Sequence, residues 1–86
     1  MFLLIDKANG GVYAVHVRDK GKVVQMFEEE DDAERYLGLL VANALDPNEH
    51  KQLEVVDVDQ ETVVKNCEMF GYNYCVITPE DIVFPP

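Results

Sequence analysis

Hydrophobic residues recur along this chain with two different periods, and the alternation of these periods predicts the order of its secondary structure. Three apolar segments come first, at residues 2–6, 12–17 and 22–27, and they are rich in the branched and aromatic residues typical of strands. The turn sequences Asn9-Gly10-Gly11 and Asp19-Lys20-Gly21 separate them. The first third of the chain is therefore expected to form three antiparallel strands.

A helical period follows, over the segment that ends near Leu45. Its apolar residues recur at the spacing of one helix face: Ala33, Tyr36, Leu37, Leu40, Val41 and Ala44. Five consecutive acids open the segment: Glu28, Glu29, Glu30, Asp31 and Asp32. Negative charge at this position stabilises a helix because it lies at the positive end of the helix dipole. Asp31 and Glu34 fit a capping box, in which the two side chains satisfy otherwise unpaired amides.

The second half of the chain repeats the alternation. Residues 53–58 predict a fourth strand, and Asp59 is a candidate N-cap of a second helix. Gly71 is suited to end that helix because glycine adopts the left-handed conformation without steric cost. On this helix one face is expected to be buried, and it carries Val63, Val64, Cys67 and Phe70. Residues 74–77 predict a last strand, and residues 82–84 could add a short edge strand.

The predicted order is β-β-β-α-β-α-β, which corresponds to an α+β fold. Two amphipathic helices each need a sheet face to cover their apolar stripe. We therefore expect a two-layer α/β sandwich, a ferredoxin-like variant, with a largely antiparallel sheet and both helices on one face. A chain of 86 residues has no room for two cores, so residues 1–86 are expected to form a single domain.

Several short motifs resemble those of a known family. They are Met26-Phe27-Glu28-x-Glu30-Asp31-Asp32-Ala33-x-Arg35-Tyr36, the later Cys67-x-x-x-Gly71-Tyr72, and the tail from Pro79-Glu80 to Pro85-Pro86. This pattern resembles a family of small cyanobacterial and chloroplast proteins described only as a domain of unknown function, the family numbered thirty-one-ten. The resemblance implies a photosynthetic source and a cytoplasmic or stroma-like location. It implies no activity and no catalytic residues.

The charge of the chain limits its partners. The formal net charge is −10; residues 1–27 contribute +2 and residues 28–86 contribute −12. Such an acidic chain repels phosphate groups, which argues against nucleic-acid binding and favours a basic protein partner. The apolar start, Met1 to Ile5, is too short for a signal sequence or a membrane span, so no membrane insertion is expected and the predicted location is cytoplasmic.

No set of residues in the sequence predicts catalysis. The chain contains no serine, which excludes a Ser-His-Asp triad, and His16 lies alone between two valines. Cys67 and Cys75 are expected to be buried and inert, because burial of a thiol in apolar surroundings raises its pKa. Asp57 and Asp59 could bind Mg²⁺, but Asp59 is already explained as a helix cap. We therefore expect no catalytic residue, no metal and no cofactor.

These observations favour a non-catalytic protein-interaction module, such as an assembly or regulatory factor in a photosynthetic organism. The expected partner contacts are the acidic run Glu28, Glu29, Glu30, Asp31 and Asp32 together with Tyr72 and Tyr74. The sequence does not identify this partner protein, and a second copy of the chain, in a homodimer, is one possibility. The alternative is a small-molecule sensor or binding domain, with a ligand site between sheet and helices or at a dimer seam.

Overall fold

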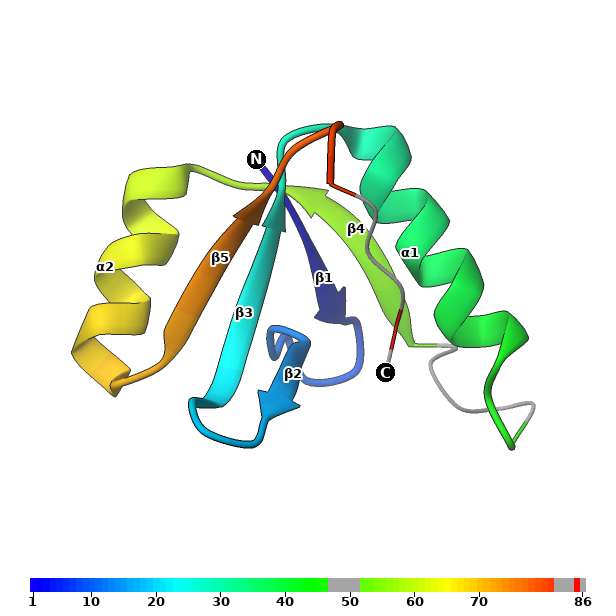
Figure 1. Ribbon diagram of the computed structural model, residues 1–86, viewed down its shortest axis with the longest axis horizontal. Helices are drawn as coiled ribbons and strands as arrows, with labels where there is room; N and C mark the ends of the chain where they lie inside the picture. The colour runs from blue at the N-terminus through cyan, green and yellow to red at the C-terminus, as the bar shows by residue number, and fades with distance from the viewer. Residues whose placement is uncertain (47–51, 82–84, 86) are drawn as a thin grey trace.

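The computed structural model describes residues 1–46, 52–81 and 85. Seven elements follow one another along the chain (Figure 1): β1 (Phe2–Asp6), β2 (Ala14–Val17), β3 (Gly21–Phe27), α1 (Glu30–Ala42), β4 (Leu53–Asp57), α2 (Gln60–Phe70) and β5 (Asn73–Ile77). The predicted α+β class and the predicted order of elements are confirmed. The strand expected over residues 82–84 lies outside the described residues.

Strand β3 lies at the centre of the sheet. Along one edge it pairs in parallel with β5, from Val23↔Asn73 to Phe27↔Ile77. Its other edge pairs antiparallel with β2 near one end and with β1 near the other, through Phe2↔Phe27. Strand β4 pairs antiparallel with β1. The sheet is therefore largely antiparallel, as predicted, and β1 and β2 share one edge of β3.

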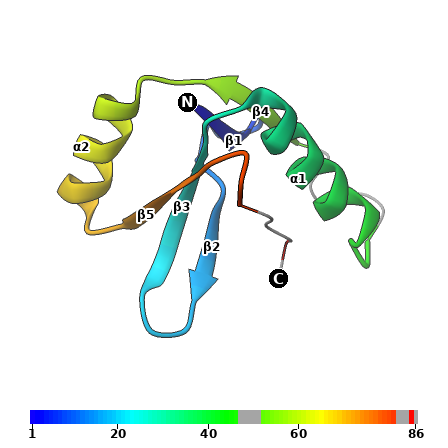
Figure 2. The same cartoon turned by 45° about the horizontal axis from the view of Figure 1, so that its top comes forward.

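The two helices cover opposite faces of the sheet. Leu4 of β1 and Phe27 of β3 pack with Tyr36 and other residues of α1. The preceding residues, Leu3 and Met26, pack with Cys67 of α2. Because neighbouring residues of a strand point to opposite faces, α1 and α2 must lie on different faces. Figures 1 and 2 show them on either side of the row of strands. The expected two-layer, ferredoxin-like arrangement with both helices on one face is therefore wrong.

Strand order gives the physical reason for this difference. Strands β3, β4 and β5 run in the same direction, because β1 is antiparallel to β3 and to β4, and β5 is parallel to β3. The connection through α1 passes from β3 across β1 to β4, and the connection through α2 returns from β4 to β5 at the far edge. Parallel crossovers share one hand, so two crossovers that move in opposite directions lie on opposite faces.

The helix starts follow different rules. Asp59 caps α2 as predicted: its Oδ2 accepts hydrogen bonds from the Thr62 amide at 3.2 Å and from the Thr62 hydroxyl at 2.8 Å. At the start of α1 the predicted capping box is absent, because the N-cap is Glu29 and its side chain makes no capping bond. Asp32 instead pairs with Arg35 at 3.4 Å. Helix α1 also ends at Ala42, three residues before the expected end.

Gly71 ends α2 in the left-handed conformation, with φ of 75°. We expect Gly71→Ala to destabilise the protein by about 1–2 kcal/mol, because a Cβ is disfavoured at this φ. Gly38 provides a matched control: it lies exposed within α1 with open space around its missing Cβ. Gly38→Ala is expected to stabilise by about 0.5–1 kcal/mol. Urea denaturation measures both, and changes of the same sign would contradict this account.

Candidate functional site

A groove of about 680 Å³ lies on the α2 face of the sheet. It is open because α2 packs mainly on β5, whereas α1 spans β4, β1 and β3 on the other face. The floor of the groove includes Leu3 and Val24 of the α2-face core and Ala14, which packs against that core. The loop between β1 and β2 forms one wall. This volume falls within the range of ligand-binding pockets.

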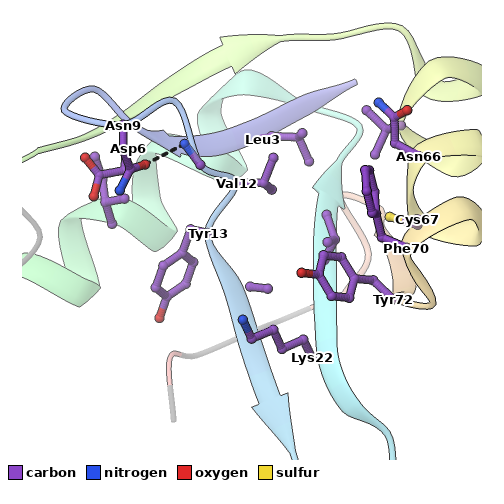
Figure 3. Close-up of a pocket in the computed structure, with 15 residues that line it drawn as sticks. Leu3, Asp6, Asn9, Val12, Tyr13, Lys22, Asn66, Cys67, Phe70 and Tyr72 are labelled. Atoms are coloured by element: carbon purple, nitrogen blue, oxygen red, sulfur yellow. Dashed lines mark hydrogen bonds between the residues drawn. The ribbon is translucent and has the colours of Figure 1, made fainter.

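Helix α2 forms the opposite wall through one stripe of side chains. The stripe consists of Val63, Asn66, Cys67 and Phe70. These positions follow the spacing i, i+3, i+4, i+7, which places them on one side of a helix. Figure 3 shows Asn66, Cys67 and Phe70 projecting from α2 on the side that faces Leu3. Apolar groups therefore dominate this wall, with one amide among them.

Large aromatic side chains are exposed where α2 ends. Phe70 is 67% exposed and Tyr72 is 44% exposed, and their ring centroids lie 6.4 Å apart. Tyr74 follows on β5, paired with Val24 of the α2-face core, and is also exposed. We name Phe70, Tyr72 and Tyr74 the aromatic rim. The prediction that Phe70 belongs to the buried face of α2 is therefore wrong.

Backbone geometry fixes the aromatic rim in place. The Gly71 amide donates to the Glu68 carbonyl at 3.4 Å, and the Tyr72 amide donates to the Cys67 carbonyl at 2.8 Å. These two bonds form the motif that commonly closes a helix at glycine. Asn73 then donates its side-chain amide to the carbonyl of Lys20 at 2.6 Å, which ties the segment to the turn between β2 and β3. Tyr72 is thus held beside the mouth of the groove.

Lys22 is the only cation among the described residues that line the groove. Its Nζ lies 5.8 Å from the centroid of the Tyr72 ring, within the range of a cation–π interaction. The one acid of the lining, Asp6, uses its Oδ1 to accept a hydrogen bond from the Ala8 amide at 2.8 Å. Asn9 likewise accepts from the Gly11 amide at 2.6 Å. These polar side chains of the loop wall thus stabilise the loop by accepting hydrogen bonds from its own backbone amides.

The two thiols lie on opposite faces of the sheet. Cys67 is buried in the groove wall, and burial raises its pKa, with a further increase from Glu68. Cys75 belongs to the α1-face core; burial raises its pKa, Asp81 adds to this, and Lys20 opposes it. A raised pKa leaves the thiol protonated at neutral pH, and the protonated form is a poor nucleophile. The expectation of buried thiols is confirmed for Cys67, while Cys75 is only partly buried.

We expect both thiols to react slowly with iodoacetamide at pH 7. The rate in the native protein should fall below the rate in urea by about two orders of magnitude or more, because the thiol must be exposed and ionised to react. Mass spectrometry of the two cysteine peptides at successive times measures each rate separately. Labelling of Cys67 as fast in the native state as in urea would contradict its assigned burial.

Tyr36 is the buried phenol of the α1-face core. Its pKa is raised to about 12, chiefly by burial; Tyr13 and Cys75 contribute smaller increases, and Gln25, which does not reach hydrogen-bond geometry, opposes them. Among the described residues its hydroxyl has no hydrogen-bond partner. The hydroxyl therefore contributes little stability at neutral pH, since an unpaired buried donor carries a desolvation cost.

This shift predicts how stability depends on alkaline pH. The folded protein holds the Tyr36 proton more tightly than the unfolded chain, whose pKa is 10.0. The free energy of unfolding therefore stays at its neutral-pH value below about pH 10, and it falls by about 2–3 kcal/mol as the pH rises to about 12. Urea denaturation between pH 9 and 12 should show this loss in the wild type beyond that in Tyr36→Phe. Parallel curves for the two proteins would contradict the assignment.

The structure separates the two sets of predicted partner contacts. Glu28, Glu29, Glu30 and Asp31 are exposed, and Asp32 is half-buried. The Glu28 amide donates to the Ile77 carbonyl at 2.9 Å, so the acidic run begins at the end of β5. Tyr72 precedes the start of β5, about 16 Å away at the rise of a strand. Tyr72 and Tyr74 therefore lie near the groove, whereas the acidic run lies at the other end of the sheet.

The remaining candidate residues have structural partners or lie apart. Asp57 is 3.6 Å from the N-terminal amine, and Asp59 caps α2. His16 is exposed on β2, in register with Lys22. Over residues 1–46, 52–81 and 85, no three His, Cys, Asp or Glu side chains are grouped to hold a metal ion. No described helix is long and apolar enough to cross a membrane.

Sequence patterns did not reveal the groove or the contact between Lys22 and Tyr72. The helical spacing of Val63, Asn66, Cys67 and Phe70 does indicate one face of a helix. Only the position of α2 over β5 shows that this face borders a groove. A family model described as "Domain of unknown function (DUF3110)" matches residues 1–86. No curated protein matches the chain, and no solved structure does.

Proposed function

This chain belongs to the DUF3110 family of unknown function, and from that premise we propose that it is a non-catalytic module that binds another protein. The binding surface consists of the groove and the aromatic rim. The observation that carries this proposal is the exposure of Phe70, Tyr72 and Tyr74 beside the groove. Exposed apolar patches of this kind are typical of protein interfaces.

The composition of the rim segment supports a protein partner. Residues 69–78 contain no charged side chain, although 28% of the chain is charged. Interface centres are depleted in charge and enriched in tyrosine, phenylalanine and methionine. Met69, the neighbour of Phe70 in α2, is also exposed but does not line the groove. A surface larger than the groove suits a protein better than a ligand that the groove alone would enclose.

The absence of a paired nucleophile in the groove supports a binding role. A catalytic thiol needs a lowered pKa and a neighbouring base. Cys67 has a raised pKa instead, and the carboxylate of Asp6 is bonded to the Ala8 amide. The described lining of the groove can therefore hold a ligand, and neither Cys67 nor Asp6 is activated to transform it.

A second copy of this chain suits the groove less well than a different protein. Each copy carries a net charge of −10, so two copies repel each other. The exposed acids of the run from Glu28 to Asp32 would steer a basic partner from a distance. The resemblance noted in the sequence supports a partner in the cytoplasm or stroma of a photosynthetic cell, where the complex would serve assembly or regulation.

Site-specific photo-crosslinking tests the proposal. A benzophenone amino acid at position 70 reports on the rim, and the same group at Val41, which is exposed on α1, is the matched control. We expect position 70 to capture a protein that position 41 does not. The captured protein, once purified, should bind Phe70→Ala at least about tenfold more weakly than wild type. Equal capture at both positions, or unchanged affinity, would overturn the proposal.

A small-molecule ligand is the second candidate function, favoured by the volume of the groove, about 680 Å³. A metabolite at 100 times its dissociation constant would stabilise the fold by about 2.7 kcal/mol. Thermal-shift measurements against a metabolite library detect this. Stabilisation that Phe70→Ala abolishes would favour the second function, and a flat result would remove it.

A further inference from the structure

We propose that the partner segment held in the groove carries an acidic residue beside an apolar one, with its carboxylate on Lys22. This inference rests on the proposed function and names the chemistry of the partner. The apolar side chain would lie against the α2 wall, between Val63 and Phe70. The carboxylate would approach the ammonium group of Lys22 from the side away from the Tyr72 ring.

The pairing state of Lys22 is the first argument. The chain has 17 acidic residues and 7 basic ones, so a lysine has many carboxylates available. Yet among the described residues the contact that Lys22 makes is with the Tyr72 ring, and no carboxylate lies within ion-pair distance. The Lys22 side chain is exposed at the groove, so the hydrogen-bond donors of its ammonium group are available to a ligand. Charge-assisted hydrogen bonds from such a group to a carboxylate are among the stronger polar contacts.

The surrounding charge is the second argument. Arg18 and Lys20 lie on the turn that joins β2 to β3, with Asp19 as the one acid between them. His16 lies in register with Lys22 on the neighbouring strand. Three basic residues and one acid thus flank this end of the groove, while the rest of the chain from residue 28 onwards carries −12. This end is the basic part of an acidic protein, and it would attract a local negative charge.

The rest of the groove lining explains why the ligand must also be apolar. Asp6 and Asn9 are engaged by the backbone amides of their own loop. The floor and the α2 wall are mainly aliphatic and aromatic, and Figure 3 shows Tyr72 between Phe70 and Lys22. A purely charged ligand would leave that surface uncovered, and a purely apolar ligand would bury the ammonium group without a partner, which costs free energy.

Selection from a phage-displayed random heptapeptide library tests this inference. The baits are wild type, Lys22→Glu and Lys65→Glu, where Lys65 is exposed on α2 outside the groove lining. We expect wild type and Lys65→Glu to select peptides with Asp or Glu next to an aromatic or aliphatic residue. We expect Lys22→Glu to select Lys or Arg at that place. The best wild-type peptide should bind Lys22→Glu at least tenfold more weakly and Lys65→Glu within about twofold of wild type.

Two further variants separate the possible failures. Lys22→Met keeps the aliphatic stem and removes the charge, so it should also weaken the acidic peptide, and circular dichroism checks its fold. Peptides that depend on Phe70 but not on Lys22 would overturn this inference and leave the proposed function standing. Failure to select any peptide sensitive to Phe70→Ala would overturn both.

Discussion

Replacing Phe27 with alanine should lower the free energy of unfolding by about 3–5 kcal/mol. Phe27 is 1% exposed, and its ring lies 5.5 Å from the ring of Tyr36, centroid to centroid. The substitution removes the aromatic surface that α1 covers and leaves a cavity that the surrounding helix and strands cannot fill. Urea denaturation measures the change, with the exposed Val17→Ala on β2 as the control. A loss below about 1 kcal/mol would mean that α1 does not cover this face.

Met26→Ala should cost about 2–5 kcal/mol, although Met26 is the immediate neighbour of Phe27. Met26 is 0% exposed and packs on the other face of the sheet with Val24 and Cys67. Two successive strand residues can both be fully buried only when both faces are covered. If both helices lay on one face, one of the two substitutions would fall on open sheet and cost little. The pair therefore tests the three-layer arrangement, and one small loss beside one large loss would contradict it.

Elements were predictable from the sequence because their signals are local. The helical period from Ala33 to Leu40, the Asp59 cap and the Gly71 end each depend on residues within one or two turns, and the structure has all three. The boundaries of α1 were less certain because its acids could cap in several ways. Glu29 occupies the cap position without a capping bond, while Asp32 pairs with Arg35.

The placement of the helices was not predictable, because it depends on strand order. The continuous apolar runs of β1 and β3 did indicate strands buried on both faces, as in Leu3-Leu4 and Met26-Phe27. What the sequence lacked was the long-range information that β4 and β5 occupy opposite edges. Once that order is known, the common hand of the two crossovers places α1 and α2 on different faces.

The groove follows from the same missing information. Phe70 shares the helical stripe of Val63 and Cys67, so the sequence favours a buried position for it. In the structure α2 lies over β5 at the edge of the sheet, and Phe70 near the end of the helix is left exposed. Lys22 and Tyr72 are 50 positions apart in the sequence and meet only through the pairing of β3 with β5. No local pattern could bring them together.

The position of the binding surface is the central claim, and chemical-shift mapping of the isotope-labelled chain tests it most directly. The unlabelled partner captured at position 70 is added stepwise, and backbone amide shifts are followed. We predict that the largest changes fall on the stripe from Val63 to Phe70, on Tyr72 and on Lys22, while α1 is unaffected. Changes confined to the acidic run from Glu28 to Asp32 and to α1 would contradict the account.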